Sequence, residues 1–394
     1  MKTWEKALAE VLERVAPLPA QRVGLADARG RFLQEAAAAT DDAPACDLSM
    51  MDGYAVGLET AAGVKLRVVG ATRAGEPRAQ GIRSGEARRI FTGAPLPGGA
   101  ERVVPQEEVE CLPENLVLLR TIPDSFFVRP RGSEAQAGEV ILRQGQRLGP
   151  AELAILAGLG LSKPSVGARP RVSHLVLGSE LVDPADSPSP GHIRDTNSIL
   201  IRSLIEENGA ELAFQRRLAD EPQAIRSAIE EAISDVLLIS GGASVGEHDH
   251  ARSCLREAGF DFVFEGIRLR PGKPSAVGFR GNQVAICLPG NPVAHLAVFH
   301  LLVRPVLGKL AGATNPWPVF YEAPLLASLP GKPNPRHTFW PAVHGPDGLR
   351  PLRFLSSGDV LALAGVNAMI SLEADASPFI VGTRVPFLPL HPAL

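Results

Sequence analysis

The chain has 394 residues, which predicts two to four domains. Apolar residues make up 45% and charged residues 21%, a composition that excludes disordered, collagen-like and coiled-coil classes. The formal net charge of −3 provides no overall electrostatic attraction to nucleic acid or to an anionic membrane. Any basic binding site must therefore be local.

Cysteine usage and the apolar runs bear on the cellular compartment. The four cysteines are widely spaced and form no CxxC pair, which argues against a disulfide framework or a structural zinc site and favours a reducing cytoplasm. The N-terminus carries Glu5 and Glu10 and lacks the apolar stretch of a signal peptide. We expect the run 293–307, which contains Arg304, to be too short and too polar to span a bilayer. The sequence predicts a soluble cytoplasmic protein.

The first half of the chain predicts a helix and then a β module. Trp4, Leu8 and Val11 share one face of a helix that starts at Thr3. Short β-type runs fill residues 54–145. A further helix follows, with Pro150 in its first turn.

From Arg171 onward, strands and helices alternate. Asp220 and Asn291 are expected to cap two of the helices, and one of the residues 195–197 a third. Such alternation indicates a parallel sheet covered on both faces. The sequence returns to short β runs after Pro316, which predicts a closing β module.

Three loops follow predicted strands, at the edge where open α/β sheets bind ligands. They span residues 178–180, 240–246 and 288–292. Their glycines let a backbone approach a ligand, and free N–H groups at helix starts attract anions. Neither a Walker A motif nor G-x-G-x-x-G is present, which disfavours ATPase and Rossmann interpretations. The candidate ligand-binding residues here are Gly241, Gly242, Ser244, Pro289, Gly290 and Asn291.

Charged residues near these loops suggest an anion and a hard cation. Arg270 and Lys273 lie on a proline-containing turn and suit a multiply charged anion. Glu180, Asp220 and Asp249 follow or flank strand ends and could hold Mg²⁺ through oxygen ligands.

Two single carboxylates, Asp220 and Asp52, also have simpler interpretations. Asp220 is by itself more typical of a helix cap, and Asp52 in the run SMMDGYAV is more typical of a turn residue. His248 and His250 lack an evident third ligand, which disfavours a zinc site.

Six motifs occur in the order and spacing of one family: SMMDGYAV, IFTGAPLPGGAERVVPQEEV, DTN, SGGASVGEHD, RPGKP and LPGNPV. The chain thus resembles the MoeA family of molybdopterin molybdenumtransferases, which includes the gephyrin E domain. The resemblance implies a multidomain α/β protein with a three-layer α/β/α molybdopterin-binding domain, N-terminal helical and β modules, and a C-terminal β-barrel-like domain. The implied boundaries are 1–45 with 138–168 for a linker domain, 46–137 for a β module, 169–314 for the pterin-binding domain and 315–394 for the last domain.

The resemblance also implies a reaction. Molybdate is inserted into adenylylated molybdopterin with release of AMP, in a Mg²⁺-dependent cytoplasmic homodimer that does not act on nucleic acid or membranes. Transient contacts with other cofactor-biosynthesis proteins or with recipient molybdoenzymes are also implied. By resemblance, the catalytic residues are Asp52, Thr92, Glu180, Asp220 and Asp249, the last three also being metal ligands. Arg129 and Glu134 resemble an Arg–acid pair, and Arg270 and Lys273 the basic residues that face oxyanions.

The chain departs from the family pattern near the predicted site. Leu177 and Ser179 replace a Thr and an Asp of the usual STGDEL motif, and Gly266 stands where a basic residue is common. Two other functions stay open on the sequence alone: a molybdopterin adenylyltransferase-like activity and a non-catalytic gephyrin-like scaffold. The first usually needs one short domain, and the second usually accompanies an extra N-terminal domain and a long linker.

Overall fold

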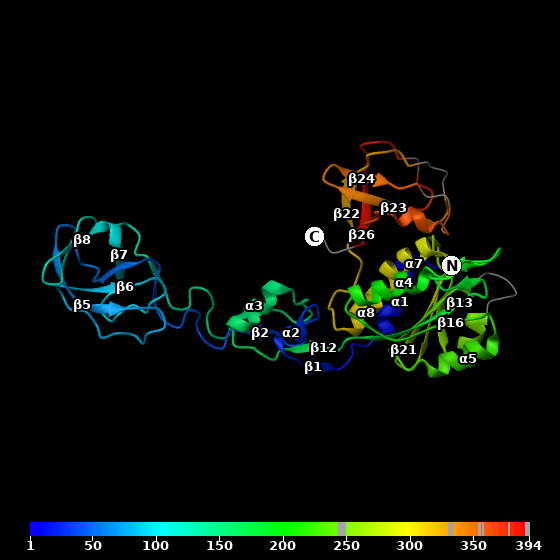
Figure 1. The fold of residues 1–394 in the computed structure, drawn as a ribbon, viewed down its shortest axis with the longest axis horizontal. Coiled ribbons are helices and arrows are strands. Elements are labelled where there is room, and N and C mark those ends of the chain that lie inside the picture. Colours follow the sequence, from blue (N-terminus) through cyan, green and yellow to red (C-terminus); the bar gives the residue numbers. More distant parts are fainter. Residues whose placement is uncertain (243–249, 330–333, 354–355, 357, 377–378, 391–394) are drawn as a thin grey trace. The chain divides into compact units, whose positions relative to one another are not determined.

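A computed structural model describes residues 1–242, 250–329, 334–353, 356, 358–376 and 379–390. The chain forms two compact units (Figure 1). Unit 1 comprises residues 1–35, 144–153 and 163–394, and unit 2 comprises residues 36–143 and 154–162. The four-part division expected from the sequence stays a prediction.

Unit 1 is built on a six-stranded sheet with the order β16-β13-β17-β21-β20-β18. The first four strands are mutually parallel, as expected, but β20 and β18 run antiparallel. The prediction of a purely parallel sheet is therefore wrong at this edge. The strands are β13 (Arg171–Leu177), β16 (Glu211–Leu218), β17 (Val236–Ser240), β18 (Asp261–Glu265), β20 (Ala276–Arg280) and β21 (Gln283–Leu288).

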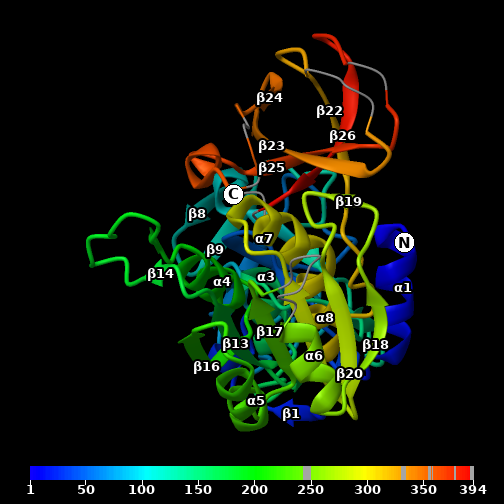
Figure 2. The same cartoon turned by 90° about the vertical axis from the view of Figure 1, so that its right-hand side faces the viewer.

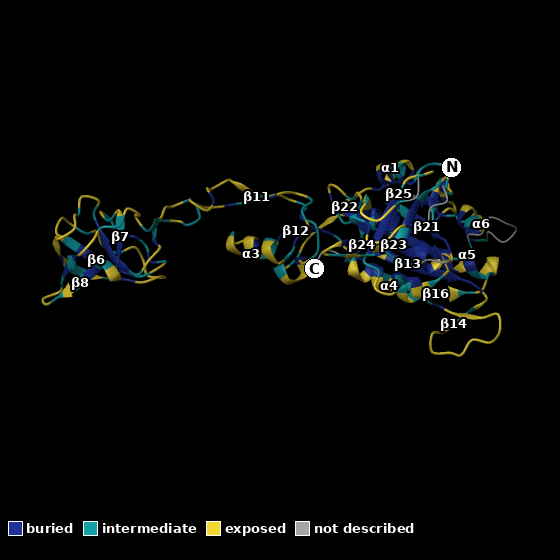
Figure 3. Ribbon diagram, turned by 90° about the horizontal axis from the view of Figure 1, so that it is seen from above, coloured by how far each residue is buried: buried dark blue, intermediate teal, exposed yellow. Residues whose placement is uncertain are grey.

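Helices cover both faces of this sheet (Figure 2). Alternate side chains of the buried strands point to opposite faces, so Leu238 packs with α1, α4, α7 and α8 while Leu237 and Ile239 pack with α5 and α6. Figure 3 shows the buried strands between these layers. The helices are α1 (Trp4–Arg14), α4 (Asn197–Glu207), α5 (Pro222–Glu231), α6 (His250–Glu257), α7 (Pro292–Val298) and α8 (Arg304–Leu310).

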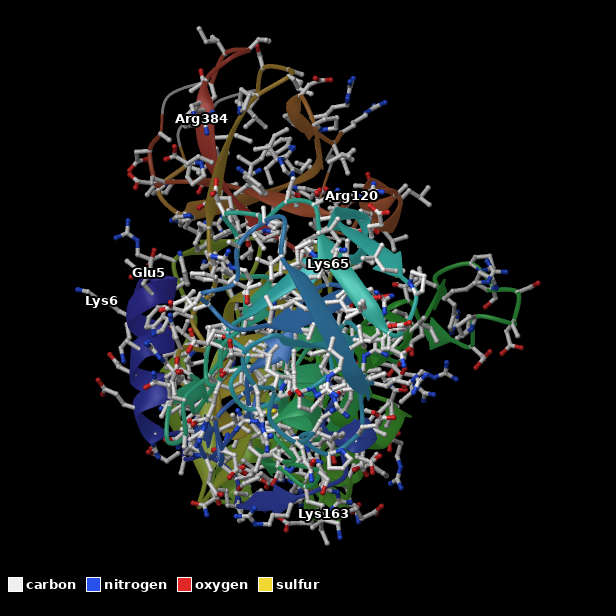
Figure 4. The ribbon with its side chains drawn as sticks, turned by 90° about the vertical axis from the view of Figure 1, so that its left-hand side faces the viewer. Glu5, Lys6, Lys65, Arg120, Lys163 and Arg384 are labelled. Carbon is white, nitrogen blue, oxygen red and sulfur yellow. The ribbon has the colours of Figure 1, made fainter. Side chains whose placement is uncertain are left out.

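The helix α1 begins at Trp4, one residue after the predicted start, because Thr3 occupies the N-cap position. The Thr3 hydroxyl accepts a hydrogen bond from the Lys6 N–H at 3.4 Å, which caps the helix. Trp4, Leu8 and Val11 are buried. Lys6 is exposed, and its side chain extends outward in Figure 4.

A π-helical segment, Phe299–Val303, joins α7 to α8, so one helical rod runs from Pro292 to Leu310. In the described residues it is the one helix long and apolar enough to cross a membrane, with 19 residues and a mean hydropathy of 1.4. The expectation that this run is too short and too polar is therefore wrong by length and by composition. Because 83% of it is buried inside unit 1, the rod behaves as a core helix.

The closing β module is confirmed. It is a six-stranded sheet with the order β19-β23-β25-β26-β22, and β24 pairs with β23. The strands are β19 (Leu269–Arg270), β22 (Tyr321–Pro324), β23 (His337–Gly345), β24 (Gly348–Pro351), β25 (Ala368–Leu372) and β26 (Arg384–Pro389), with a short 3₁₀ helix at Val360–Leu363. Smaller pairs in unit 1 are β1 (Ala20–Arg22) with β12 (Ser165–Gly167) and β14 (Leu181–Val182) with β15 (Ile193–Arg194), and α2 spans Leu25–Ala28.

Unit 2 contains a six-stranded sheet with the order β7-β4-β6-β5-β9-β8, in which only β5 and β6 pair in parallel. Both faces are buried: Tyr54 and Val104 pack on one face, and Ala55 and Val103 on the other. The strands are β4 (Gly53–Val56), β5 (Lys65–Thr72), β6 (Glu86–Ile90), β7 (Arg102–Pro105), β8 (Val109–Leu112) and β9 (Leu116–Leu119), with a 3₁₀ turn at Gln106–Glu108. Two further pairs are β2 (Ala37–Ala38) with β11 (Val140–Leu142) and β3 (Leu48–Ser49) with β10 (Val128–Arg129). The helix α3 (Pro150–Gly158) follows β11.

Candidate active site

The four parallel strands of unit 1 end at one edge of the sheet, and three of the loops that follow them are the predicted ligand loops. β13 leads into residues 178–180, β17 into 241–242 and β21 into 289–291. The fourth strand, β16, leads to Asp220. Because parallel strands share one carboxyl edge, the fold brings these segments together.

Hydrogen bonds join the loops after β13 and β16. The Ser179 N–H donates to the Asp220 Oδ2 at 3.3 Å, and the Asp220 N–H donates to the Ser179 Oγ at 3.3 Å. The prediction that Asp220 caps α5 is wrong, since Glu221 occupies the N-cap position. The carboxylate instead satisfies a backbone donor of the neighbouring strand's loop, which keeps it at the sheet edge.

The other N-cap predictions have mixed outcomes. At α4 the cap position is Thr196, whose side chain makes no cap bond; Asp195 accepts from the Ser198 N–H at 3.0 Å and from its hydroxyl. Asn291 occupies the cap position of α7, with Pro292 in the first turn as predicted.

The predicted metal ligands fall into two groups. Glu180 is exposed and its carboxylate folds back over Gly178, where an added Cβ would lie 2.9 Å from its Oε2. Glu180 and Asp220 thus come from adjacent strand ends. Asp249 and Ser244 lie outside the described residues, and the residues that are described contain no group of three metal-binding side chains.

The glycine pair after β17 is required by the backbone. Gly241 and Gly242 have φ values of +82° and +63°, a region that favours glycine. A Cβ on Gly241 would lie 2.2 Å from the Leu177 carbonyl oxygen of the neighbouring strand. The Gly241 N–H in turn donates to the Leu288 carbonyl at 3.3 Å. Gly241 therefore allows three strand ends to approach closely, a role that the sequence does not reveal.

The loop after β21 is exposed at Gly290 and Asn291, and a side chain of α4 holds its backbone. Asn197, at the start of α4, donates its Nδ2–H to the Gly290 carbonyl at 2.7 Å. We did not predict Asn197 as a site residue, although its DTN motif marked the segment. The anchor holds the backbone of this loop from the side of α4.

Three buried polar residues beneath this edge were missed by the sequence analysis. His174, Ser240 and His295 are all fully buried. The Ser240 Oγ lies 2.6 Å from the His174 Nε2 and 2.7 Å from the His295 Nε2. Burial lowers the pKa of His174 to about 3 and the pKa of His295 to about 4. Both imidazoles are therefore neutral at physiological pH. The only available signal was a histidine in the middle of an aliphatic strand.

The basic turn lies at the border of the C-terminal sheet. Arg270 ends β19 and is in register with Thr338 of β23, while Lys273 is exposed. The Lys273 carbonyl accepts from the Ile267 N–H at 3.0 Å, and the Ser275 hydroxyl donates to the Gly272 carbonyl at 2.8 Å. These bonds hold the backbone of the turn while the lysine side chain extends into solvent.

Unit 2 holds its own pair of predicted residues together. The Asp52 Oδ1 accepts from both the backbone N–H and the hydroxyl of Thr92, each at 2.8 Å. These two bonds, with a smaller contribution from the nearby Arg89 charge, hold the pKa of Asp52 below its usual value. Asp52 is thus more than a turn residue: it binds a residue 40 positions along the chain. The predicted Arg129–Glu134 pair also forms, with the Nη1 and Oε1 atoms 2.8 Å apart on the surface.

Comparisons with known proteins agree with this architecture. Residues 2–160 match the model of the MoeA N-terminal region (domains I and II), and residues 173–309 match that of a probable molybdopterin binding domain. A molybdopterin molybdenumtransferase of a Nostoc species is 35% identical over 366 residues, covering 89% of this chain and 84% of the relative. The chain belongs to the MoeA family of molybdopterin molybdenumtransferases.

Other members of the MoeA family give the same result. The molybdopterin molybdenumtransferase of Staphylococcus aureus is 29% identical over 393 residues, covering 97% of this chain and 94% of the relative. Two crystal structures of the MoeA molybdopterin biosynthesis protein from Pyrococcus horikoshii match with TM-scores of 0.84, at 29% and 27% identity and over 99% of this chain. The expected multidomain α/β fold of the MoeA family is confirmed.

Proposed function

We propose that this protein inserts molybdenum from molybdate into adenylylated molybdopterin and releases AMP. The observation that carries the proposal is the set of loops at one edge of the unit 1 sheet, joined by the Ser179–Asp220 and Asn197–Gly290 hydrogen bonds, in a member of the MoeA family. In the reaction, water cleaves the phosphoanhydride bond, which leaves AMP and the phosphate of molybdopterin. Molybdate exchanges one Mo–O bond for bonds to the two dithiolene sulfurs, and the displaced oxygen leaves as water with the two thiol protons.

Both substrates are anions, and the chain offers fixed groups to neutralise them. Molybdate is a dianion, and the pterin substrate carries a phosphoanhydride. Arg270 and Lys273 supply positive charge from a turn whose backbone is held by hydrogen bonds. The Gly241 N–H is already bonded to the Leu288 carbonyl, so Gly241 is proposed to let a phosphoryl group approach the backbone, and the N–H groups of Gly242 and the start of α7 are suited to its oxygens. Preorganised donors of this kind would stabilise the charge that develops on departing AMP.

Mg²⁺ is proposed as the cofactor. Glu180, Asp220 and Asp249 would supply oxygen ligands of the kind that this ion prefers, and the two described residues come from adjacent strand ends. When bound, the ion would offset negative charge on the phosphoanhydride. Asp52, kept ionised by Thr92, is proposed as the carboxylate that unit 2 contributes. Arg129 and Glu134 are proposed to contribute to substrate binding as a pair.

We further propose that the active protein is a cytoplasmic homodimer that makes transient contact with other cofactor-biosynthesis proteins or with recipient molybdoenzymes. The proposed substrates are small molecules, and the net charge of −3 gives no overall attraction to nucleic acid or anionic membranes. We therefore propose that the protein acts on neither.

Glu180→Gln tests the role of the unit 1 edge. We expect at least a tenfold loss of AMP release from adenylylated molybdopterin, because the neutral amide no longer balances a bound cation. The melting temperature should be unchanged, since Glu180 is exposed. Glu206→Gln, at an exposed position of α4, is the matched control and should keep wild-type activity. Wild-type turnover in Glu180→Gln would remove this carboxylate from the site.

A further inference from the structure

A chain of hydrogen bonds, buried at its centre, leads from the edge strand β16 of the unit 1 sheet to the loop between β21 and α7. The Gln215 Nε2 lies 3.0 Å from the His174 Nδ1, and the His174 Nε2 lies 2.6 Å from the Ser240 Oγ. The same Oγ lies 2.7 Å from the His295 Nε2, and the His295 Nδ1 lies 3.0 Å from the Asn291 carbonyl oxygen. The chain therefore crosses from β16 through β13 and β17 to α7.

The donor and the acceptor of every bond in the chain can be assigned by starting at the Asn291 carbonyl. The Asn291 carbonyl can only accept, so the His295 Nδ1 carries the proton and its Nε2 accepts. Ser240 must then donate to His295, and it accepts from the Nε2–H of His174. The His174 Nδ1 in turn accepts from the Gln215 amide.

The far end of the chain fits the same assignment. The Gln215 amide also donates to the Ser198 carbonyl at 3.0 Å, and its Oε1 accepts from Arg202 at 2.8 Å. All donors and acceptors of the two imidazoles are thereby satisfied, although both rings are fully buried. A satisfied buried network favours a single arrangement of its members, because any other leaves a polar atom without a partner.

We propose that the His174–Ser240–His295 chain is a positioning device that holds the Asn291 carbonyl and thereby fixes the loop 289–291 for ligand binding. What the loop binds rests on the function proposed above. Asn197 holds the adjacent Gly290 carbonyl from α4, so two consecutive carbonyls of the loop are held by side chains. His174, Ser240 and His295 are positioning residues that do not themselves touch the substrate.

Two substitutions of His295 separate its two bonds. Asparagine can place an amide N–H where the imidazole Nδ1–H lies, so His295→Asn keeps the bond to the loop and loses the bond to Ser240. Glutamine reaches the position of the Nε2, so His295→Gln keeps an acceptor for Ser240 and loses the bond to the loop. Ser240→Ala breaks the middle of the chain. Ser173→Ala is the matched control, because the Ser173 hydroxyl is buried on β13 and has no hydrogen-bond partner among the described residues.

Amide hydrogen exchange of the segment 288–296 in the full-length protein tests the positioning without reference to activity. We expect exchange about tenfold faster in Ser240→Ala and His295→Gln, and close to wild type in His295→Asn and Ser173→Ala. In wild type, ¹⁵N NMR should show the Nε2–H tautomer for His174 and the Nδ1–H tautomer for His295. The opposite tautomer at His295, or unchanged exchange in Ser240→Ala and His295→Gln, would overturn the proposal.

Kinetics then connects the positioning with the reaction. For adenylylated molybdopterin we expect KM to rise about tenfold in His295→Gln, with kcat little changed and most of the KM recovered in His295→Asn. An unchanged KM in His295→Gln, despite faster exchange of the loop, would overturn its role in ligand binding. Absence of turnover in wild type would instead count against the proposed function and leave the exchange and tautomer results standing.

Discussion

At the scale of single residues, Asp52 and Thr92 offer a direct test in unit 2. Thr92→Val removes the hydroxyl donor but keeps the backbone N–H, so the pKa of Asp52 should rise toward its usual value. Carboxyl ¹³C NMR titration measures this change. Asp42, whose pKa is lowered by the Ala137 N–H and by Arg131, is an internal reference and should titrate as in wild type. An unaltered Asp52 titration would show that the hydroxyl bond contributes nothing.

The buried histidines make the stability of unit 1 depend on pH. The folded pKa values of His174 and His295 are about 3 and about 4, against 6.5 for an ordinary imidazole. Below pH 6.5 the unfolded chain binds protons that the folded chain does not, so stability is lost as the pH falls. Together the two residues should lower the free energy of unfolding by roughly 4 kcal/mol between pH 7 and pH 5. His337, whose pKa is also lowered by burial, acts in the same direction.

Denaturant unfolding followed by tryptophan fluorescence measures this loss, since Trp4, Trp317 and Trp340 all lie in unit 1. In His295→Asn the difference between the two pH values should shrink by about 2 kcal/mol. Equal free energies of unfolding at pH 7 and pH 5 in wild type would contradict the neutral, buried state of both rings.

Sequence reasoning at this scale found residues but not their partners. Asp52, Thr92, Arg129 and Glu134 were predicted, and the structure brings them together in pairs. Asp220 was expected to cap its own helix, but a backbone donor of another strand provides its partner. Bonds such as those among His174, Ser240 and His295 join segments far apart in the chain, so no local pattern reveals them.

At the scale of elements, Gly53 allows two strands of unit 2 to pair closely. A Cβ on this residue would lie 2.1 Å from the Val104 carbonyl of β7. Gly53→Ala should therefore destabilise unit 2 by about 1–3 kcal/mol and displace the adjacent Asp52. Hydrogen exchange of peptides from β4 and β7 measures the loss. Gly57→Ala is the control, because its Cβ would meet its nearest neighbour at an ordinary 3.5 Å. Equal protection in both variants would contradict this packing.

The helices and strands themselves were largely predictable, because the spacing of apolar residues and the Gly and Pro residues of turns mark them locally. The direction of β20 was not, since a buried strand has the same composition in either direction. The missed signal is Gly281–Asn282, a two-residue connection between β20 and β21 that favours an antiparallel hairpin. The 19-residue apolar rod was ambiguous in a similar way, because its length and composition fit either a membrane-spanning helix or a core helix until its burial was known.

At the scale of the whole molecule, the predicted catalytic residues are divided between the two units. Asp52 and Thr92 belong to unit 2, and Glu180 and Asp220 belong to unit 1. If the protein is the homodimer proposed above, we predict that each site uses Asp52 of one copy and Asp249 of the other. Asp52→Asn and Asp249→Asn chains should then be inactive alone, and mixing them after partial unfolding should restore about a quarter of wild-type activity. No recovery in verified heterodimers would contradict this arrangement.

The central claim is molybdenum insertion with release of AMP, and one assay tests it most directly. Purified wild-type protein is incubated with adenylylated molybdopterin and Mg²⁺, with and without molybdate, and the AMP formed is measured. The account predicts that AMP appears in step with molybdenum-loaded pterin and only when molybdate is present. An adenylyltransferase would instead consume ATP to adenylylate free molybdopterin, and a scaffold would bind the pterin without turnover. AMP release that is absent, or that is indifferent to molybdate, would contradict the account.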